Sequence, residues 1–161
     1  MRAALANQPD GVSLSEIDVS SLPFYNGDVE ESGGVLPASV QSLHDTLAAA
    51  DGILIFTPEY NGSYPALTKN VIDWLSRPPA GWTGKGISLV VTTPGPRAGQ
   101  NLREHFDAMF SLGYLPIKHH PSHGIGSYGE ILGDDGEVAD AATIETLTAY
   151  VAAFAQRCTE D

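Results

Sequence analysis

The sequence predicts an α/β protein in which a parallel β-sheet is covered by helices on both faces. Apolar runs typical of strands alternate along the chain with amphipathic stretches typical of helices. Two of the runs, residues 53–57 and 87–92, are almost continuously apolar, as strands buried on both faces are. With 161 residues and neither an internal repeat nor a linker, the chain is expected to form one domain over residues 1–161.

The first third of the chain begins and ends with helices. Residues 1–7 are predicted as a helical fragment that Gln8-Pro9-Asp10-Gly11 stops. Residues 12–17 alternate apolar and polar side chains, which predicts a short strand near the edge of the sheet. Residues 18–34 are rich in Ser, Gly, Asp and Pro and are predicted as a long loop that residues 22–25 pack down. A helix follows over residues 36–50.

The remaining elements follow from the spacing of apolar residues and from breakers. Residues 53–57 are a strand, residues 64–75 a helix stopped by Arg77-Pro78-Pro79, and residues 87–92 a second buried strand. Residues 100–112 are predicted as a helix, 114–117 as a short strand and 118–136 as a polar, Gly-rich loop. Residues 139–157 form the final helix, with one apolar face made of Ile144, Leu147, Val151 and Phe154.

Composition and charge narrow the classes of protein. The formal net charge is −12, from 20 acidic and 8 basic residues, which argues against a nucleic-acid partner because such proteins gather Lys and Arg on one face. No stretch approaches the roughly 18 apolar residues of a membrane span, and the N-terminus lacks the apolar core of a signal peptide. The single cysteine, Cys158, excludes an intrachain disulfide. We therefore expect a cytoplasmic protein without a membrane partner.

Two polar loops leave the two most apolar strands. They are residues 58–63, Pro-Glu-Tyr-Asn-Gly-Ser, and residues 93–99, Thr-Pro-Gly-Pro-Arg-Ala-Gly. In parallel sheets ligands bind beyond the carboxyl ends of the strands. Backbone groups, an aromatic cover from Tyr60 and close approach at glycines would suit a flat aromatic ligand with a polar edge. Pro, Asn and Gly are also common in turns without any function, so ordinary turns are the alternative.

A resemblance to the NADPH-dependent FMN reductase family is carried by two stretches, ADGILIFTPEYNGSYPALTKNVIDWLSRPP and GKGISLVVTTPGPRAGQNLREHF. The stretches IDVSSLPFYNGDVE and GDDGEVAD also match the pattern of this family, which includes chromate and quinone reductases. The resemblance implies a three-layer flavodoxin-like sheet with helices on both faces. It also implies FMN as cofactor and NADPH or NADH as co-substrate, with hydride passed through FMN to a quinone, a flavin or an oxidised metal anion.

The resemblance also implies the site residues and the assembly. The residues expected to bind the flavin ring are Pro58, Glu59, Tyr60, Asn61, Gly62, Thr93, Pro94, Gly95 and Gly99. Ala98 stands where the family usually has a glycine, and Pro96 lacks an N–H, so the second loop is expected to be stiffer. No catalytic side chain is expected, and Glu59 is interpreted as structural, tying its loop or bonding across a dimer. A homodimer or homotetramer through the region of residues 64–75 is expected.

The start of the sequence departs from the family pattern. The family begins with a strand and a Gly-Ser-x-Arg-x-x-Ser-x-Asn loop, which binds the FMN phosphate where the first helix opens. Residues 1–5 resemble the latter half of that helix. We therefore expect residues 12–17 and 53–57 to lack the strand between them, and this chain alone to bind FMN weakly. A start assigned at an internal methionine and a real truncation are the two explanations.

Other patterns leave alternatives open. His119, His120 and His123 invite a zinc site, but they lie in a predicted loop without helical spacing or a carboxylate partner, and we expect no metal. Arg97 is interpreted either as a cofactor or subunit contact or as a solvated side chain, and Trp74 as packing or a subunit contact. Two alternative functions remain, namely a flavodoxin-like binding module that no longer binds flavin, and a pure electron carrier without NADPH turnover.

Overall fold

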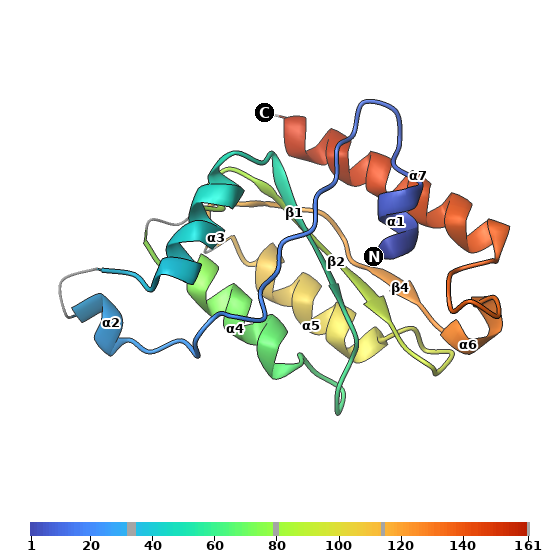
Figure 1. The fold of residues 1–161 in the computed structure, drawn as a ribbon, viewed down its shortest axis with the longest axis horizontal. Coiled ribbons are helices and arrows are strands. Elements are labelled where there is room, and N and C mark those ends of the chain that lie inside the picture. The colour runs from blue at the N-terminus through green and yellow to red at the C-terminus, as the bar shows by residue number, and fades with distance from the viewer. Residues whose placement is uncertain (32–34, 79–80, 114, 161) are drawn as a thin grey trace.

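The structure is a computed structural model, and it describes residues 1–31, 35–78, 81–113 and 115–160. Figure 1 shows a sheet between two layers of helices, which confirms the predicted fold class. The helices are α1 (Arg2–Ala6), α2 (Asp28–Glu31), α3 (Ala38–Ala48), α4 (Ala66–Leu75), α5 (Gln100–Ser111), α6 (Tyr128–Ile131) and α7 (Ala141–Thr159). The strands are β1 (Gly52–Thr57), β2 (Gly86–Thr92), β3 (Lys118–His119) and β4 (His123–Ile125).

Strand β2 is the centre of the sheet. It pairs in parallel with β1 on one side and with β3 and β4 on the other. Ile87 lies opposite His119 and Val90 opposite His123, so two residues of β2 face three residues of the partner, 120–122. This is a one-residue bulge, and Pro121 explains it because a proline has no N–H for the ladder. The strands β3 and β4 are thus two pieces of one interrupted edge strand.

The side chains of β2 alternate between two cores. Ile87, Leu89 and Val91 are fully buried against α3, α4 and α5, whereas Val90 packs against α1 and α7. The larger core also contains side chains from the helices and from the turn before β2, namely Leu43, Leu47, Ile72, Leu75, Trp82, Leu102, Phe106 and Phe110. The smaller core contains Ala4, Leu147 and Val151. This period of two fixes which helices lie on which face (Figure 1).

The prediction of a strand over residues 12–17 is wrong. The segment is extended but forms no strand, and among the described residues β1 pairs with β2 alone. Val12 and Leu14 pack on the smaller core, while Ile17 packs on the larger one, so the segment passes from one layer to the other beside β1. Its alternating apolar residues serve this crossing. Residues 52–56 of β1 are consequently half-buried rather than covered on both faces as predicted.

Two further predictions about the second half of the chain are wrong. Tyr114 lies outside the described residues, and residues 115–117 form bends because Pro116 cannot donate to a ladder; pairing begins at Lys118. The predicted loop over residues 118–136 contains β3, β4 and α6. These elements have two to four residues, too few to show a period in the sequence. The loop over residues 18–34 holds one helical turn, α2, and its residues 32–34 lie outside the description.

The long first loop is fixed to α4 by polar contacts. The Pro23 carbonyl accepts hydrogen bonds from Trp74 Nε1 at 2.8 Å and from Asn70 Nδ2 at 2.9 Å, and the Tyr25 N–H donates to Asn70 Oδ1 at 2.8 Å. Trp74 is fully buried and packs edge-on against Tyr25, which assigns it the packing role that the sequence left open. In the part of the chain that the structure describes, no helix is both long and apolar enough to cross a bilayer.

Paired glycines at the amino ends of β1 and β2 accommodate the cysteine. Gly52 lies opposite Gly86, and a Cβ added at either position would lie 2.4 or 2.3 Å from the Cys158 sulfur. The last turns of α7 therefore seat on the sheet only because these two positions carry no side chain. Burial, reinforced by Asp51, raises the pKa of the Cys158 thiol.

Candidate functional site at the carboxyl edge of the sheet

Residues 58–63 and 93–99, here called the carboxyl-edge loops, follow β1 and β2 and lie side by side because the two strands are parallel neighbours (Figure 1). The second loop is also bonded to the turn after β4. Thr93 N donates to the Ile125 carbonyl at 3.0 Å, Ser127 N to the Gly95 carbonyl at 3.2 Å and Tyr128 N to the Thr93 carbonyl at 3.3 Å. Three strand ends therefore build one continuous edge.

The first loop is a tight hairpin turn with an aromatic residue beside it. Asn61 and Gly62 have φ values of 52° and 73°, and the backbone groups of Tyr60 and Ser63 exchange hydrogen bonds of 3.1 and 3.0 Å. Two central residues with positive φ define the turn type for which Asn-Gly is the preferred sequence. The turn holds Tyr60 at the surface, where 61% of the residue is exposed.

Glu59 fastens this loop to the start of α5. Its Oε2 accepts a hydrogen bond of 2.8 Å from the backbone N–H of Leu102. The first N–H groups of a helix have no partner within the helix, and a carboxylate there is stabilised by the helix dipole. The contact is the structural tie that the sequence favoured for Glu59, made within the chain.

The second loop separates an open glycine from a packed one. A Cβ at Gly95 would meet nothing within 4 Å, whereas a Cβ at Gly99 would lie 2.2 Å from Val91 Cγ1. Gly99 therefore seats the start of α5 on β2, and Gly95 leaves the backbone open to a ligand. The Thr93 hydroxyl is turned inward and donates to the Gly95 carbonyl at 3.0 Å. Ala98 adopts a φ of 51°, which fits the position at which the family pattern has glycine.

A hollow of about 450 Å³, here called the edge hollow, adjoins the loops. Its lining comes from the carboxyl ends of β1, β2 and β4, from α6 and the segment after it, and from α1 and α7. The lining residues are Met1, Arg2, Ala3, Phe56, Thr57, Pro58, Thr92, Ile125, Tyr128, Ile131, Leu132, Gly136, Glu137, Val138 and Leu147. Among the predicted site residues, all of which the structure describes, Pro58 alone lines it.

The sequence could have indicated part of the edge hollow. Phe56, Thr57 and Thr92 stand at the carboxyl ends of predicted strands, where ligands are expected. Tyr128 and the other residues of α6 carried no such signal, because they lie in a stretch predicted as a loop.

The two charged side chains of the edge hollow face each other. Arg2 Nε lies 2.7 Å from Glu137 Oε1, and Arg2 Nη2 donates to the Gly136 carbonyl at 3.5 Å. Burial and the charge of Arg2 lower the pKa of the Met1 amino group, which Glu137 and Glu16 oppose. The acidic and basic groups at this end therefore balance.

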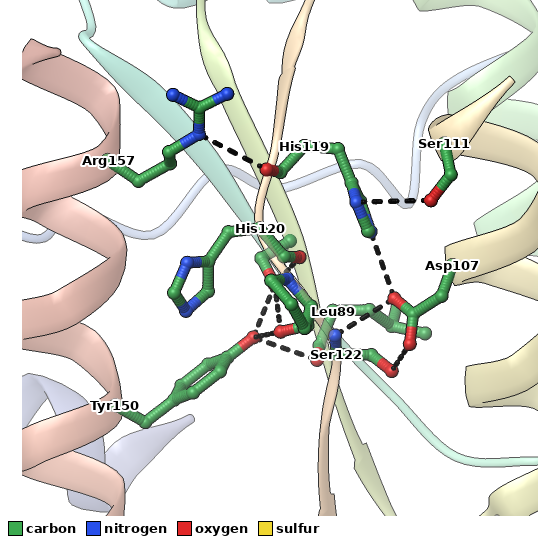
Figure 2. Close-up of polar contacts among 10 residues, drawn as sticks. Leu89, Asp107, Ser111, His119, His120, Ser122, Tyr150 and Arg157 are labelled. Atoms are coloured by element: carbon green, nitrogen blue, oxygen red, sulfur yellow. Dashed lines mark hydrogen bonds and ion pairs between the residues drawn. The ribbon is translucent and has the colours of Figure 1, made fainter. Parts of the chain in front are cut away.

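A second polar cluster surrounds the bulge between β3 and β4 (Figure 2). This bulge cluster consists of Ser88, Asp107, His119, Ser122 and Tyr150. On one face, Asp107 Oδ1 lies 3.0 Å from His119 Nε2 and accepts from Ser122 N at 2.9 Å, while its Oδ2 accepts from Ser122 Oγ at 2.7 Å. One carboxylate on α5 thus satisfies the chain where Pro121 interrupts the ladder.

The opposite face of the bulge is satisfied by hydroxyl groups. Ser88 Oγ donates to the His120 carbonyl at 2.8 Å, and Tyr150 OH donates to the Pro121 carbonyl at 3.0 Å. The Ser88 and Tyr150 hydroxyls also hydrogen-bond each other. Burial lowers the pKa of His120 and of His123, whose rings pack on Tyr150 with centroids 5.3 and 4.8 Å away.

The three histidines therefore have separate neighbours. His119 turns to α5, whereas His120 and His123 turn to α7 (Figure 2 shows the first two). Among the residues that the structure describes, no group of three or more His, Cys, Asp or Glu side chains is placed to hold a metal ion.

Comparisons with known proteins agree with this edge. The family model described as NADPH-dependent FMN reductase matches residues 1–124. A quinone reductase of Escherichia coli K12 is 32% identical over 140 residues, which cover 86% of this chain and 74% of that protein. An NAD(P)H-dependent FMN reductase of Pseudomonas aeruginosa is 37% identical over 109 residues, covering 65% of this chain and 58% of the relative.

A solved structure extends the likeness to three dimensions. FerB, a flavoenzyme NAD(P)H:(acceptor) oxidoreductase from Paracoccus denitrificans, superposes with a TM-score of 0.80 at 28% identity, covering 98% of this chain and 86% of FerB. The flavodoxin-like fold class and the family predicted from the resemblance are both confirmed. The chain belongs to the NADPH-dependent FMN reductase family.

Proposed function

We propose that the protein is an FMN-dependent NAD(P)H oxidoreductase of the quinone reductase type. It takes hydride from NADPH or NADH and passes electrons to a quinone, a flavin or a similar small acceptor. The observation that carries the proposal is the juxtaposition of two polar loops at the carboxyl ends of β1 and β2, in a chain of this family. The names of the relatives, quinone reductase and FMN reductase, support the same chemistry.

The carboxyl-edge loops fit the ring of FMN. They offer an exposed aromatic side chain at Tyr60, open backbone at Gly95 and a hollow of about 450 Å³ beside them, a volume suited to a cofactor. The residues proposed to hold the ring are Pro58, Glu59, Tyr60, Asn61, Gly62, Thr93, Pro94, Gly95 and Gly99. Bound FMN supplies the hydride and electron transfer, and the protein supplies position and polarity.

These residues divide into contacts and supports. Tyr60, Pro94 and Gly95 face solvent at the edge and are proposed to touch the ring. Glu59 and Gly99 act through other groups, because the first is bonded to Leu102 N and the second is packed on Val91. The Glu59 carboxylate is engaged with the backbone, so it is not proposed as an acid or base. No side chain is assigned a proton transfer.

A homodimer or homotetramer in the cytoplasm is part of the proposal. Phe24 and Leu67 are 80% and 45% exposed, and both belong to the region of α4, to which the Pro23 carbonyl is bonded. Exposed large apolar side chains on one helix region are a common feature of subunit contacts. The buried and unreactive setting of Cys158 is compatible with a reducing compartment.

The test is a titration of the purified chain with FMN. We expect quenching of FMN fluorescence, a protein-bound flavin spectrum, and NADPH oxidation when a quinone is added. Glu59→Ala should weaken FMN binding because the first loop loses its tie to α5, whereas Glu59→Gln keeps an acceptor and Glu104→Ala removes an exposed acid elsewhere on α5.

The alternatives give different results in the same titration. If no flavin binds, the chain is a binding module of this fold rather than an oxidoreductase. If flavin binds but NADPH is not oxidised in the presence of a quinone, the chain is an electron carrier.

A further inference from the structure

The wall of the edge hollow is apolar, unlike the loops beside it. Its side chains include Phe56, Ile125, Ile131, Leu132, Val138 and Leu147. Met1, Tyr128 and Leu132, which line it, are 44%, 39% and 37% exposed. Apolar side chains left in contact with water around a hollow gain free energy when an apolar group covers them.

The charges of the edge hollow offer no net attraction for an anion. Arg2 is held by Glu137 at 2.7 Å, and both line the hollow. A phosphate that pairs with Arg2 must displace the Glu137 carboxylate and then lie beside it. The phosphate also loses hydration against the apolar wall, which is unfavourable unless hydrogen bonds replace the lost water. The formal net charge of the whole chain, −12, adds to this repulsion.

An uncharged group meets none of these penalties. Its apolar surface covers the walls, and its polar atoms can reach the Thr57 and Thr92 positions at the strand ends. The Arg2–Glu137 pair can then stay intact at the rim, where both side chains are largely exposed.

We infer that the edge hollow binds an uncharged, largely apolar part of the ligand and does not recognise phosphate, so that the site takes unphosphorylated flavin as readily as FMN. The inference rests on the proposed function, because it assumes that the carboxyl-edge loops hold the flavin ring. It adds the class of ligand that the adjoining hollow selects, which is an uncharged flavin such as riboflavin.

The test compares FMN with riboflavin on the ligand-free chain by fluorescence quenching. We expect dissociation constants within about threefold of each other, a difference of about 0.7 kcal/mol or less, at both about 0.05 M and 0.5 M salt. Tighter binding of FMN by more than about threefold overturns the inference but leaves the proposed function standing. Binding of neither flavin overturns both.

Variants at the rim test the role of the charges. Glu137→Gln should leave Arg2 without its carboxylate and shift the preference toward FMN by about three- to tenfold at low salt. Glu145→Gln is the control, because it removes the same charge from an exposed position on α7. Arg2→Gln should leave the ratio of the two constants unchanged. A selective loss of FMN binding in Arg2→Gln would show that Arg2 holds the phosphate and would overturn the inference.

A variant of the wall tests whether the ligand enters the edge hollow. Leu132→Asp places a charge on the apolar lining and should weaken riboflavin binding at least about fivefold. Leu112→Asp is the matched control, because Leu112 is 61% exposed and lies just after α5, outside the lining. Unchanged riboflavin binding in Leu132→Asp, with the chain folded by circular dichroism, overturns the inference.

Discussion

The carboxyl-edge loops and the bulge cluster both place polar, turn-forming residues beside β2, but they use them differently. In the bulge cluster the side chains bond one another and the backbone that Pro121 leaves unpaired. In the carboxyl-edge loops the conformation is set by backbone and glycines, and Tyr60 is left facing solvent. A polar segment is a candidate site when its groups remain available after the fold is satisfied, and the bulge cluster fails this criterion.

The comparison breaks most visibly at Gly99. A Cβ there would lie 2.2 Å from Val91 Cγ1 at a φ of 64°. Gly99→Ala should therefore lower the free energy of unfolding by about 3 kcal/mol, from overpacking and backbone strain. Urea unfolding followed by circular dichroism measures this. Gly95→Ala is the control, since nothing lies within 4 Å of its Cβ position, and it should change stability by less than about 0.5 kcal/mol. Equal midpoints for the two variants would contradict the assignment of roles.

The next largest effect is expected at Asp107. Asp107→Ala leaves Ser122 N and the His119 ring without their acceptor, and should lower the free energy of unfolding by about 2 kcal/mol. Asp73→Ala removes an exposed carboxylate that pairs with Lys69, and should cost less than about 0.5 kcal/mol. Flavin affinity should be the same in both variants. A stable Asp107→Ala variant that no longer binds flavin would place the bulge cluster in the functional site.

Tyr60 should show the reverse pattern. Because 61% of the residue is exposed, Tyr60→Ala should leave the urea midpoint almost unchanged. Loss of its ring should weaken flavin binding about three- to tenfold, the size of one aromatic contact. Tyr60→Phe retains the ring and serves as the control. If Tyr60→Ala binds FMN as tightly as the unmodified chain, Tyr60 does not cover the flavin.

The smallest effect concerns pH and belongs to the bulge side. Burial is the main cause that lowers the pKa of His120, with His119 and Arg157 adding to it and Asp107 and Glu160 opposing; for His123 burial and Arg103 act together. The unfolded chain, with histidine near pKa 6.5, therefore binds protons before the folded chain does. Stability is fully present above about pH 6.5 and is lost as the pH falls toward the folded-state values.

Thermal unfolding between about pH 7 and pH 5 tests this linkage. The melting temperature should fall slightly with pH, and the fall should be smaller in a His120→Gln, His123→Gln double variant. His44 is buried and its pKa is also lowered, so part of the slope should remain. An identical slope in the double variant would show that these two rings do not contribute.

Apolar periodicity predicted the helices and the two long strands because each has enough residues to show it. It failed where a pattern had a second explanation. Residues 12–17 alternate like a strand, yet Val12 and Ile17 anchor a crossing between two cores. The strands β3 and β4 have two and three residues and are separated by Pro121, so nothing in the sequence distinguished them from a loop.

The candidate site was predictable where it follows strand ends and turn chemistry. Asn61-Gly62 indicates its hairpin turn directly, and the two loops follow from the rule for parallel sheets. The edge hollow was not predictable, because its walls come from α1, β4, α6 and α7, which are far apart in the sequence. The contact of Glu59 with Leu102 likewise joins residues that only the folded chain brings together.

The glycine pair Gly52 and Gly86 has a consequence for measuring the dynamics of the protein. Since the Cys158 sulfur lies in the notch that these glycines leave, a thiol reagent reaches it only when the end of α7 lifts from the sheet. The labelling rate of this single thiol therefore serves as a built-in clock for local opening. Comparing that rate with and without flavin would time how far occupancy of the carboxyl edge slows motions at the opposite edge.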